Sequence, residues 1–400
     1  MAEVSSFSRL EIACLEGRLQ SVRFRQKSFH SLYNIIQTQS SNIKDAIAAD
    51  TGHTEAEVTL EYALAISELR SHYDELNLEE DIKQQHSLEN LKATTTNTGI
   101  VYLIPSKQNL FYSVISALTA SLAAGNCVVV ELPTTLTQVS GLLRKMLPSA
   151  LDSDVFAISS TRPPQDFLSK CQVVSQAEED DDTLSSSAKV VAIVDRSANV
   201  SEAASIIGTS RVSFNGRAAY APDLVLVNEF VADDFLFHLV QAVTTPLSKP
   251  SNSTINHQQR SSPKAQSDGV GQIMKELESS EGVRVVMSGA SGNIVEVKDR
   301  QKAPLGRRIE GRVILVCRIT SLDDAIDLCN GLKTPLQASY VFAAPTEANY
   351  LSRYTDARIS CTNHIPAELL GNRSICTSTS DDSAESISTL SDYSVPVPTT

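Results

Sequence analysis

A strand, a helix and a second strand follow one another within residues 99–130, and this order constrains the fold more than any other feature of the sequence. Residues 99–104 form a short apolar run, 111–124 have the length and composition of a buried helix, and 127–130 are a second apolar run. Two strands joined by a helix in this way lie parallel in one sheet. The sequence therefore predicts an α/β protein whose parallel sheet is covered by helices.

The remaining chain extends this pattern. Helices are predicted over 8–49, 55–76, 138–147, 200–208, 233–243, 321–330 and 347–354, and strands over 155–158, 190–194, 224–227, 283–287, 313–317 and 340–342. Residues 161–188 lack a clear period, and their acidic run predicts a solvated loop. Residues 289–293 predict a plain turn, 245–268 a flexible loop, and 374–400 a disordered tail.

Composition excludes several classes of function. A net charge of −13 is the wrong sign for a nucleic-acid binder, and the longest apolar runs are too short to span a membrane. The seven cysteines are odd in number and never form a Cys-x-x-Cys pair, which favours a reducing compartment over a disulfide framework. We therefore expect a cytoplasmic protein without nucleic-acid or membrane partners.

Residues 211–223 carry the most informative motif, Arg-Val-Ser-Phe-Asn-Gly-Arg-Ala-Ala-Tyr-Ala-Pro-Asp. This segment resembles the nucleophile segment of aldehyde dehydrogenases, which reads roughly Asn-x-Gly-Gln-x-Cys-x-Ala-Pro-Asp. Matching Gly216 and the Ala-Pro-Asp ending at Asp223 places Ala219 where the family has its cysteine. A methyl group cannot form the covalent thiohemiacetal of that family. The order of elements extends the resemblance over residues 25–366 and implies an aldehyde-dehydrogenase-like fold, with a parallel-sheet cofactor-type domain and an α/β catalytic-type domain.

The resemblance also locates two further catalytic positions. The family holds the substrate oxyanion with a loop Asn, because a tetrahedral oxyanion needs fixed donors; counting from the flanking glycines puts Gln108 there. The family's general base, a Glu that activates the deacylating water, corresponds to Thr183. The neighbouring Asp182 is a candidate for a displaced base.

The cofactor positions are altered as well. Glu131 stands where the family places a Lys on the adenosine ribose, and Glu310 lies two residues from the position of the Glu that holds the nicotinamide ribose. The segment between 158 and 190 contains no Gly-Ser-Thr helix start that would meet a pyrophosphate. We therefore expect no bound cofactor, with NAD(P) implied only if the protein is active.

Cys361 and His364 form a Cys-x-x-His pair in a segment that lines the substrate funnel of the family. The pair is a candidate rescue nucleophile or half of a metal site. A zinc site needs about four ligands, and no second pair with suitable spacing exists, so no metal is expected. The simpler interpretation is a buried small thiol beside a turn histidine.

Taken together, these substitutions predict a catalytically inactive relative with a structural or regulatory role, paired with itself or with an active relative. The alternative is an active NAD(P)-dependent oxidoreductase that oxidises an aldehyde to an acid, accessory to a biosynthetic pathway, with Cys361 as its nucleophile. A decayed copy without a selected function is a third interpretation. The predicted segments are a degenerate cofactor-type domain over 1–205, with part of an oligomerisation ribbon near 86–103, then a catalytic-type domain over 206–345, a closing segment over 346–373 and the tail.

Overall fold

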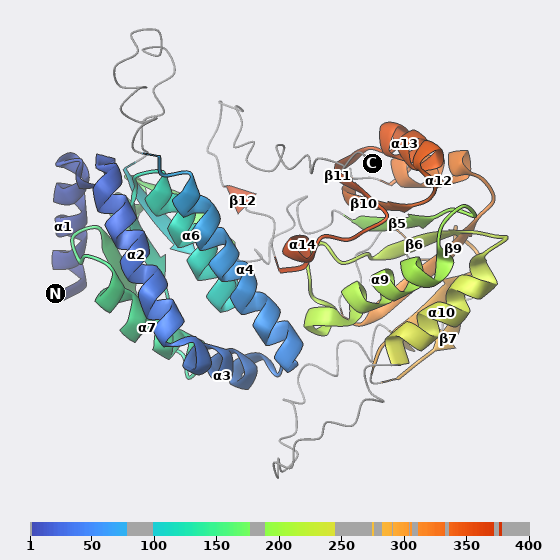
Figure 1. The fold of residues 1–400 in the computed structure, drawn as a ribbon, viewed down its shortest axis with the longest axis horizontal. Helices are drawn as coiled ribbons and strands as arrows, with labels where there is room; N and C mark the ends of the chain where they lie inside the picture. The colour runs from blue at the N-terminus through green and yellow to red at the C-terminus, as the bar shows by residue number, and fades with distance from the viewer. Residues whose placement is uncertain are drawn as a thin grey trace, which may run out of the picture.

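The protein folds into two α/β halves, each built on one mainly parallel sheet (Figure 1). The structure, a computed structural model, describes residues 2–77, 99–176, 189–244, 274–275, 282–289, 291–303, 305, 311–332, 336–371 and 376–377. The predicted α/β class and parallel sheets are confirmed. Residues 86–98 of the ribbon predicted near 86–103 lie outside the described residues, as do the loop at 245–268 and the tail at 378–400.

Helices precede the first sheet, as predicted. They are α1 (Ala2–Leu15), the short 3-10 helix η1 (Arg18–Gln20), α2 (Val22–Thr38), α3 (Ser40–Thr51) and α4 (Glu55–Asp74). Gly52 ends α3 with a φ of 67°, a conformation that glycine adopts without steric cost. Thr54 and Glu57 form a reciprocal capping box at the start of α4, in which each side chain accepts the other residue's backbone N–H.

The first sheet has the strand order β12-β4-β1-β2-β3. Its strands are β1 (Ile100–Ile104), β2 (Cys127–Glu131), β3 (Phe156–Ser159), β4 (Cys171–Ser175) and the antiparallel β12 (Cys376–Thr377), with helices α6 (Leu110–Ala123), α7 (Gln138–Ala150) and α8 (Gln165–Leu168). No helix or strand was predicted over 161–176, where the structure has α8 and β4, and the acidic run predicted to be a loop lies outside the described residues. The expected disorder from 374 does not hold for β12, which pairs with β4.

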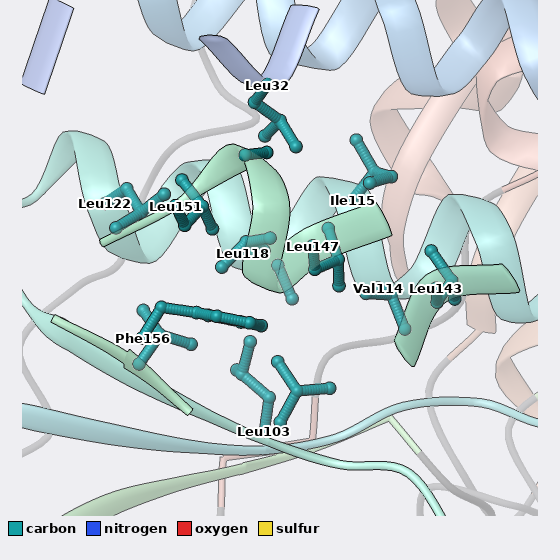
Figure 2. Close-up of a cluster of buried hydrophobic side chains, with 14 of the residues drawn as sticks. Leu32, Leu103, Val114, Ile115, Leu118, Leu122, Leu143, Leu147, Leu151 and Phe156 are labelled. Carbon is teal, nitrogen blue, oxygen red and sulfur yellow. The ribbon is translucent and has the colours of Figure 1, made fainter. Parts of the chain in front are cut away.

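Apolar side chains from three layers meet in the first half. Figure 2 shows Leu118 of α6 and Leu147 of α7 between Leu32 of α2 and Leu103 of β1. All four are at most 2% exposed. Because α6 is covered by helices on one side and by the sheet on the other, its sequence is apolar nearly all round. Truncating such a leucine to alanine typically costs about 2–5 kcal/mol.

The second sheet has the order β11-β10-β5-β6-β9-β8-β7, parallel except for β7. Its strands are β5 (Val190–Val194), β6 (Leu224–Asn228), β7 (Val283–Met287), β8 (Asn293–Val297), β9 (Val313–Ile319), β10 (Leu336–Phe342) and β11 (Ala357–Thr362). Its helices are α9 (Val200–Val212), η3 (Ser213–Gly216), α10 (Ala232–Thr244), α12 (Leu322–Asn330), α13 (Pro345–Tyr354) and α14 (Ala367–Gly371).

Two features of this sheet differ from the sequence prediction. Strand β8 starts at the end of the turn expected at 289–293 and had not been predicted. Strand β5 pairs with β6 and β10, so the chain passes from the first sheet to the second between residues 175 and 190, whereas the sequence placed its domain boundary at 205.

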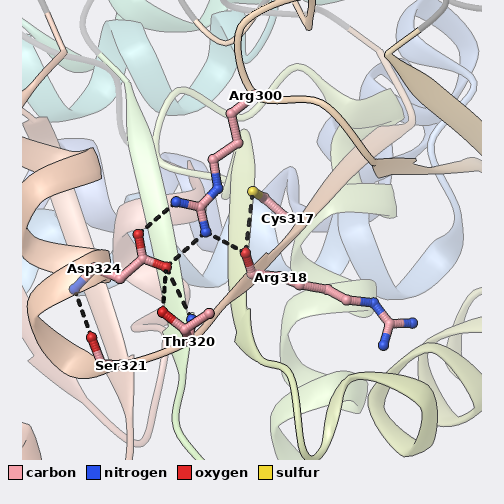
Figure 3. A network of polar contacts seen from close by, with 6 residues as sticks. All are labelled: Arg300, Cys317, Arg318, Thr320, Ser321 and Asp324. Carbon is pink, nitrogen blue, oxygen red and sulfur yellow. Dashed lines mark hydrogen bonds and ion pairs between the residues drawn. The ribbon is translucent and has the colours of Figure 1, made fainter.

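A polar network fixes α12 to the second sheet (Figure 3). Ser321 caps the helix by accepting the N–H of Asp324, as predicted. Arg300 binds both carboxylate oxygens of Asp324, at 2.5 and 2.7 Å, and donates to the carbonyl of Arg318. The bond from Arg300 is the main reason why the pKa of Asp324 falls to about 2.

Candidate functional site

The segment expected to hold the nucleophile begins with a strained turn directly after α9. Phe214 and Asn215 both have left-handed backbones, with φ of 52° and 59°, and Gly216 follows with φ of 71°. Left-handed conformations cost non-glycine residues about 1–2 kcal/mol each. A Cβ at Gly216 would lie 2.2 Å from the carbonyl carbon of Gly311. Glycine is therefore required at 216 by both the backbone and the close approach of a second chain segment.

Contacts from two other segments hold this turn in place. The N–H of Phe214 donates to Glu57 Oε1 of α4 at 2.8 Å, and Arg312 Nη2 donates to Asn215 Oδ1 at 2.8 Å. The Phe214 ring also packs edge-on against His53, 5.4 Å between centroids. The beginning of α4 in the first half therefore binds directly to the turn in the second half, as Figure 1 allows the reader to follow.

The end of the segment is held by a buried ion pair. Arg211 Nη1 lies 3.0 Å from Asp223 Oδ1, and the two side chains are 1% and 3% exposed. Arg211 Nε also donates to the carbonyl of Val313, and Asp223 Oδ2 accepts the N–H of Val190. The aspartate of the Ala-Pro-Asp motif thus joins β5, β6 and β9, which is a structural role.

Ala219 lies inside the protein, with 7% of its surface exposed. It shares a hydrophobic cluster with Tyr220 and Tyr340, while Ala218 and Phe214 pack on Leu370 of α14 in a second cluster. The Tyr340 hydroxyl donates to the carbonyl of Tyr220 at 2.9 Å, and burial raises the pKa of Tyr340 far above its ordinary value. The position predicted for the nucleophile is therefore packed with apolar groups.

Cys361 is the one other candidate that the structure brings to this cluster. It lies on β11 opposite Tyr340 and is half-buried against the apolar residues that surround Ala219. Burial raises the pKa of its thiol, so the nucleophilic thiolate is disfavoured. His364 is exposed and lies 2.8 Å from the carbonyl of Thr362. Among the described residues no group of three or more His, Cys, Asp or Glu side chains is arranged to hold a metal ion.

Comparison with known proteins identifies the family. The family model described as the aldehyde dehydrogenase family matches residues 171–368. Aldehyde dehydrogenase family 3 member B1 of Rattus norvegicus is 23% identical over 358 residues, covering 82% of this chain and 75% of the relative; the Homo sapiens protein of that name is 24% identical over 366 residues, covering 84% and 77%. The chain belongs to the aldehyde dehydrogenase superfamily.

Solved structures support the same fold. The substrate-bound Staphylococcus aureus AldH superposes with a TM-score of 0.71 at 18% identity, covering 93% of this chain and 87% of that one. The aldehyde dehydrogenase from Bartonella henselae gives 0.70 at 16% identity, covering 90% and 83%. At these identities the likeness concerns the fold, and the chemistry depends on individual side chains.

The candidate oxyanion residue of this aldehyde dehydrogenase relative belongs to the first half. Gln108 lies half-buried in the loop between β1 and α6, where its N–H donates to Ser106 Oγ at 3.4 Å. Glu131 ends β2, and its carboxylate accepts the Tyr102 hydroxyl at 2.5 Å. Glu131 therefore belongs to the first sheet, whereas the cluster that contains Ala219 packs on the second. Thr183, Asp182 and Glu310 lie outside the described residues.

The dinucleotide crevice of doubly wound folds opens at the carboxyl ends of strands, where the strand order reverses. Here the reversal lies between β1 and β4. Side chains bridge this point: the N–H of Ser106 donates to Ser113 Oγ at 2.8 Å, and Ser113 Oγ donates to Gln176 Oε1. The N–H of Gln176 in turn donates to the carbonyl of Ile104. The protein's own polar groups are thus hydrogen-bonded to one another across this edge of the sheet.

Two surface cavities in the described part of the chain lie elsewhere. One, of about 240 Å³, lies between α1, α7 and β3; the other, of about 320 Å³, lies between α2 and α4. Neither is lined by Ala219, Gln108, Glu131 or Cys361.

The sequence prediction missed two glutamates on one face of α4. Glu57 holds the turn at Phe214, while Glu61, one helical turn later, accepts the N–H of Tyr112 at the start of α6. Glu61 is 2% exposed, and burial raises its pKa to about 7. The Thr-x-x-Glu capping signature was a signal for Glu57. No comparable signal marked Glu61.

Proposed function

We propose that this aldehyde dehydrogenase relative is catalytically inactive and has a structural or regulatory role as a partner in an oligomer. The observation that carries the proposal is the buried methyl group of Ala219, at the position that the motif resemblance assigns to the nucleophile. Acyl transfer in this family's manner needs a group that attacks the carbonyl, and alanine supplies none. The chain around it has the Gly216 and Ala-Pro-Asp sequence of the family's motif, so we infer that the fold outlasted the chemistry.

Cys361 is a poor substitute for the missing nucleophile. A thiol attacks as the thiolate, and burial raises the pKa of this thiol, with no opposing cation or base among the described residues. His364 points its ring nitrogen at a backbone carbonyl close to its own position. These contacts favour the inactive interpretation over an aldehyde-oxidising enzyme.

The residues present also do not fit NAD(P). The pyrophosphate edge is bridged by Ser106, Ser113 and Gln176. Glu131 places a carboxylate, bound to Tyr102, where the family has a lysine on the ribose. A negative charge there repels a phosphorylated ligand instead of attracting it. We therefore assign no cofactor to the protein and derive no hydride transfer through one.

An exposed edge of the second sheet supports the proposed assembly with another chain. Strand β11 borders the second sheet, and among the described residues no strand pairs with its outer side. Its side chains alternate between half-buried and exposed, with Arg358, Ser360 and Thr362 exposed. An edge of this kind accepts a strand from another chain. We propose a homo-oligomer or a hetero-oligomer with an active relative in the cytoplasm, in keeping with six free cysteines among the described residues.

Calorimetric titration of the purified protein with NAD and NADP tests the proposal. We expect no binding heat at cofactor concentrations up to about 1 mM, where ordinary dehydrogenase sites are saturated. Analytical ultracentrifugation of the same sample, alone and mixed with an active relative, then measures whether the protein associates with itself or with that relative. Micromolar cofactor affinity combined with a monomeric state at all concentrations would contradict both parts of the proposal.

A further inference from the structure

The cavity of about 240 Å³ between α1, α7 and β3 has two cations in its wall. Arg9 comes from α1 and Arg144 from α7, and the described residues that line the cavity include no acidic side chain. The other lining residues are Ser153 and five apolar ones, Pro148, Leu151, Phe156, Ala157 and Ile158. An anion in this cavity therefore meets two positive charges and no competing carboxylate in the wall.

The apolar part of the wall reaches the core of the first half. Leu151 and Phe156 are 5% and 3% exposed, and Figure 2 shows both among the buried side chains of that core. Strand β3 is the last strand of its sheet, and among the described residues no strand pairs with its outer side. An apolar cavity of about 150 Å³ is large enough for benzene. The volume beside β3 is therefore sufficient for one aromatic ring that bears a carboxylate.

Arg144 is half-buried, and its guanidinium contacts only neutral acceptors among the described residues. Nη1 and Nη2 lie 3.2 and 3.3 Å from Ser160 Oγ, and Nη2 donates to the carbonyl of Leu132. A guanidinium has five N–H donors, and these contacts supply two acceptor atoms. A partly desolvated charge without a counter-ion is costly. An anion that reaches Arg144 therefore gains charge-assisted hydrogen bonds and relieves this cost.

Arg9 places the second charge nearer to solvent. The residue is exposed, and its Nη1 lies 3.4 Å from the hydroxyl of Ser153, in the turn before β3. Arg144 contacts Ser160, directly after β3. The two guanidinium groups are therefore anchored at opposite ends of the strand, with the apolar residues of β3 between them along the chain.

We propose that this cavity binds a small carboxylic acid with an apolar body, of the size of a single aromatic ring. The planar guanidinium of Arg144 matches the two oxygens of the carboxylate, and Arg9 adds attraction from the exposed side. The ring packs against Leu151 and Phe156. The site lies apart from Ala219 and from the edge of the sheet that ends at Ser106 and Gln176, so it goes beyond the proposed oligomer role and does not depend on dehydrogenase activity.

Titration calorimetry of the full chain with benzoate and with benzamide, its neutral counterpart of nearly equal size, tests the site. Benzamide should bind the wild type about tenfold more weakly than benzoate, since it lacks the charge. Arg144→Gln should weaken benzoate about tenfold and change benzamide less than about twofold. The matched control is Lys145→Gln, because Lys145 is the next residue of α7, is exposed and has no partner among the described residues. Its benzoate affinity should stay within about twofold of the wild type, as remote surface charges are screened.

Two further variants protect the test against a folding defect in Arg144→Gln, which also loses the bonds to Leu132 and Ser160. Arg9→Gln changes an exposed residue and should weaken benzoate about threefold. Ala157→Leu fills part of the cavity and should weaken benzoate and benzamide alike. Urea unfolding checks that each variant is folded at the temperature of the titration. No benzoate binding to the wild type up to about 10 mM, equal affinities for benzoate and benzamide, or equal benzoate affinities of Arg144→Gln and Lys145→Gln would overturn the proposal.

Discussion

Replacing Glu57 by alanine should destabilise the protein far more than the same change two residues earlier. Glu57 accepts two hydrogen bonds from the cap residue Thr54 and one from the N–H of Phe214, all between 2.8 and 2.9 Å. Loss of a helix cap costs about 1 kcal/mol, and loss of a hydrogen bond to a charged group about 1.5–3 kcal/mol. The free energy of unfolding should therefore fall by about 2–4 kcal/mol.

Glu55→Ala is the control, because Glu55 lies exposed in the same first turn of α4. Such surface changes usually alter stability by less than about 0.5 kcal/mol. Glu57→Gln keeps one acceptor oxygen and should fall between the two. Urea unfolding gives the stabilities, and hydrogen exchange at the Phe214 amide reports the local bond. Equal midpoints and equal exchange rates for the Glu57→Ala and Glu55→Ala proteins would refute the role assigned to this contact.

The effect should also depend on pH. Burial alone would raise the pKa of Glu57, but hydrogen bonds from Thr54 and Phe214 outweigh it and lower the pKa below its ordinary value. A lowered pKa means that the stabilisation is fully present above the unfolded-state pKa of about 4.3 and is lost as the pH falls through the folded-state value. The difference between the wild type and Glu57→Ala should therefore shrink below about pH 4, whereas the Glu55→Ala difference should stay flat.

Three further changes test other contacts. Asp50→Ala removes the carboxylate that accepts two N–H groups at the start of α7, at 2.9 and 2.8 Å. Thermal unfolding should show that the free energy of unfolding falls by about 1 kcal/mol. The control, Asp45→Ala at an exposed position, should change it almost not at all. Arg211→Met leaves Asp223 buried without its counter-charge and should cost about 3–5 kcal/mol in urea unfolding; a loss below about 1 kcal/mol would contradict this. Ala219→Cys should react with iodoacetamide only slowly, because the site is 7% exposed, and rapid alkylation would show an open funnel.

The strands with unbroken apolar sequences were predictable, whereas β4 and β8, whose apolar patterns are interrupted by polar residues, were not. Strand β7 was predicted although it contains Arg284. The strand at 190–194 is entirely buried and apolar, and its place along the sequence was predicted. Strand β8 escaped prediction because Glu296 interrupts its apolar pattern. Glu296 is fully buried, and its charge is balanced by Arg318 at 2.8 Å and Lys298 at 2.9 Å. Arg318 comes from a neighbouring strand, so only the folded sheet reveals the compensation.

The residues of the candidate site were also predictable only where a contiguous motif identified them. A motif of contiguous residues was enough to assign Ala219 to the family's nucleophile position, because Gly216 and the Ala-Pro-Asp sequence fix the alignment. The contact between Glu57 and Phe214 joins residues 157 positions apart, and a single sequence carries no signal for such a pairing. The bridge from Ser113 to Gln176 likewise depends on strand order, which the missed strand β4 obscured.

The most direct test of the proposed lack of catalysis is an assay of aldehyde-dependent NADH and NADPH formation by the purified wild-type protein, run beside Cys361→Ala. The packing around Ala219 and the raised pKa of the Cys361 thiol predict no turnover above the protein-free background in either sample. Turnover in the wild type that disappears in Cys361→Ala would contradict the account and would show that the nucleophile had moved to β11.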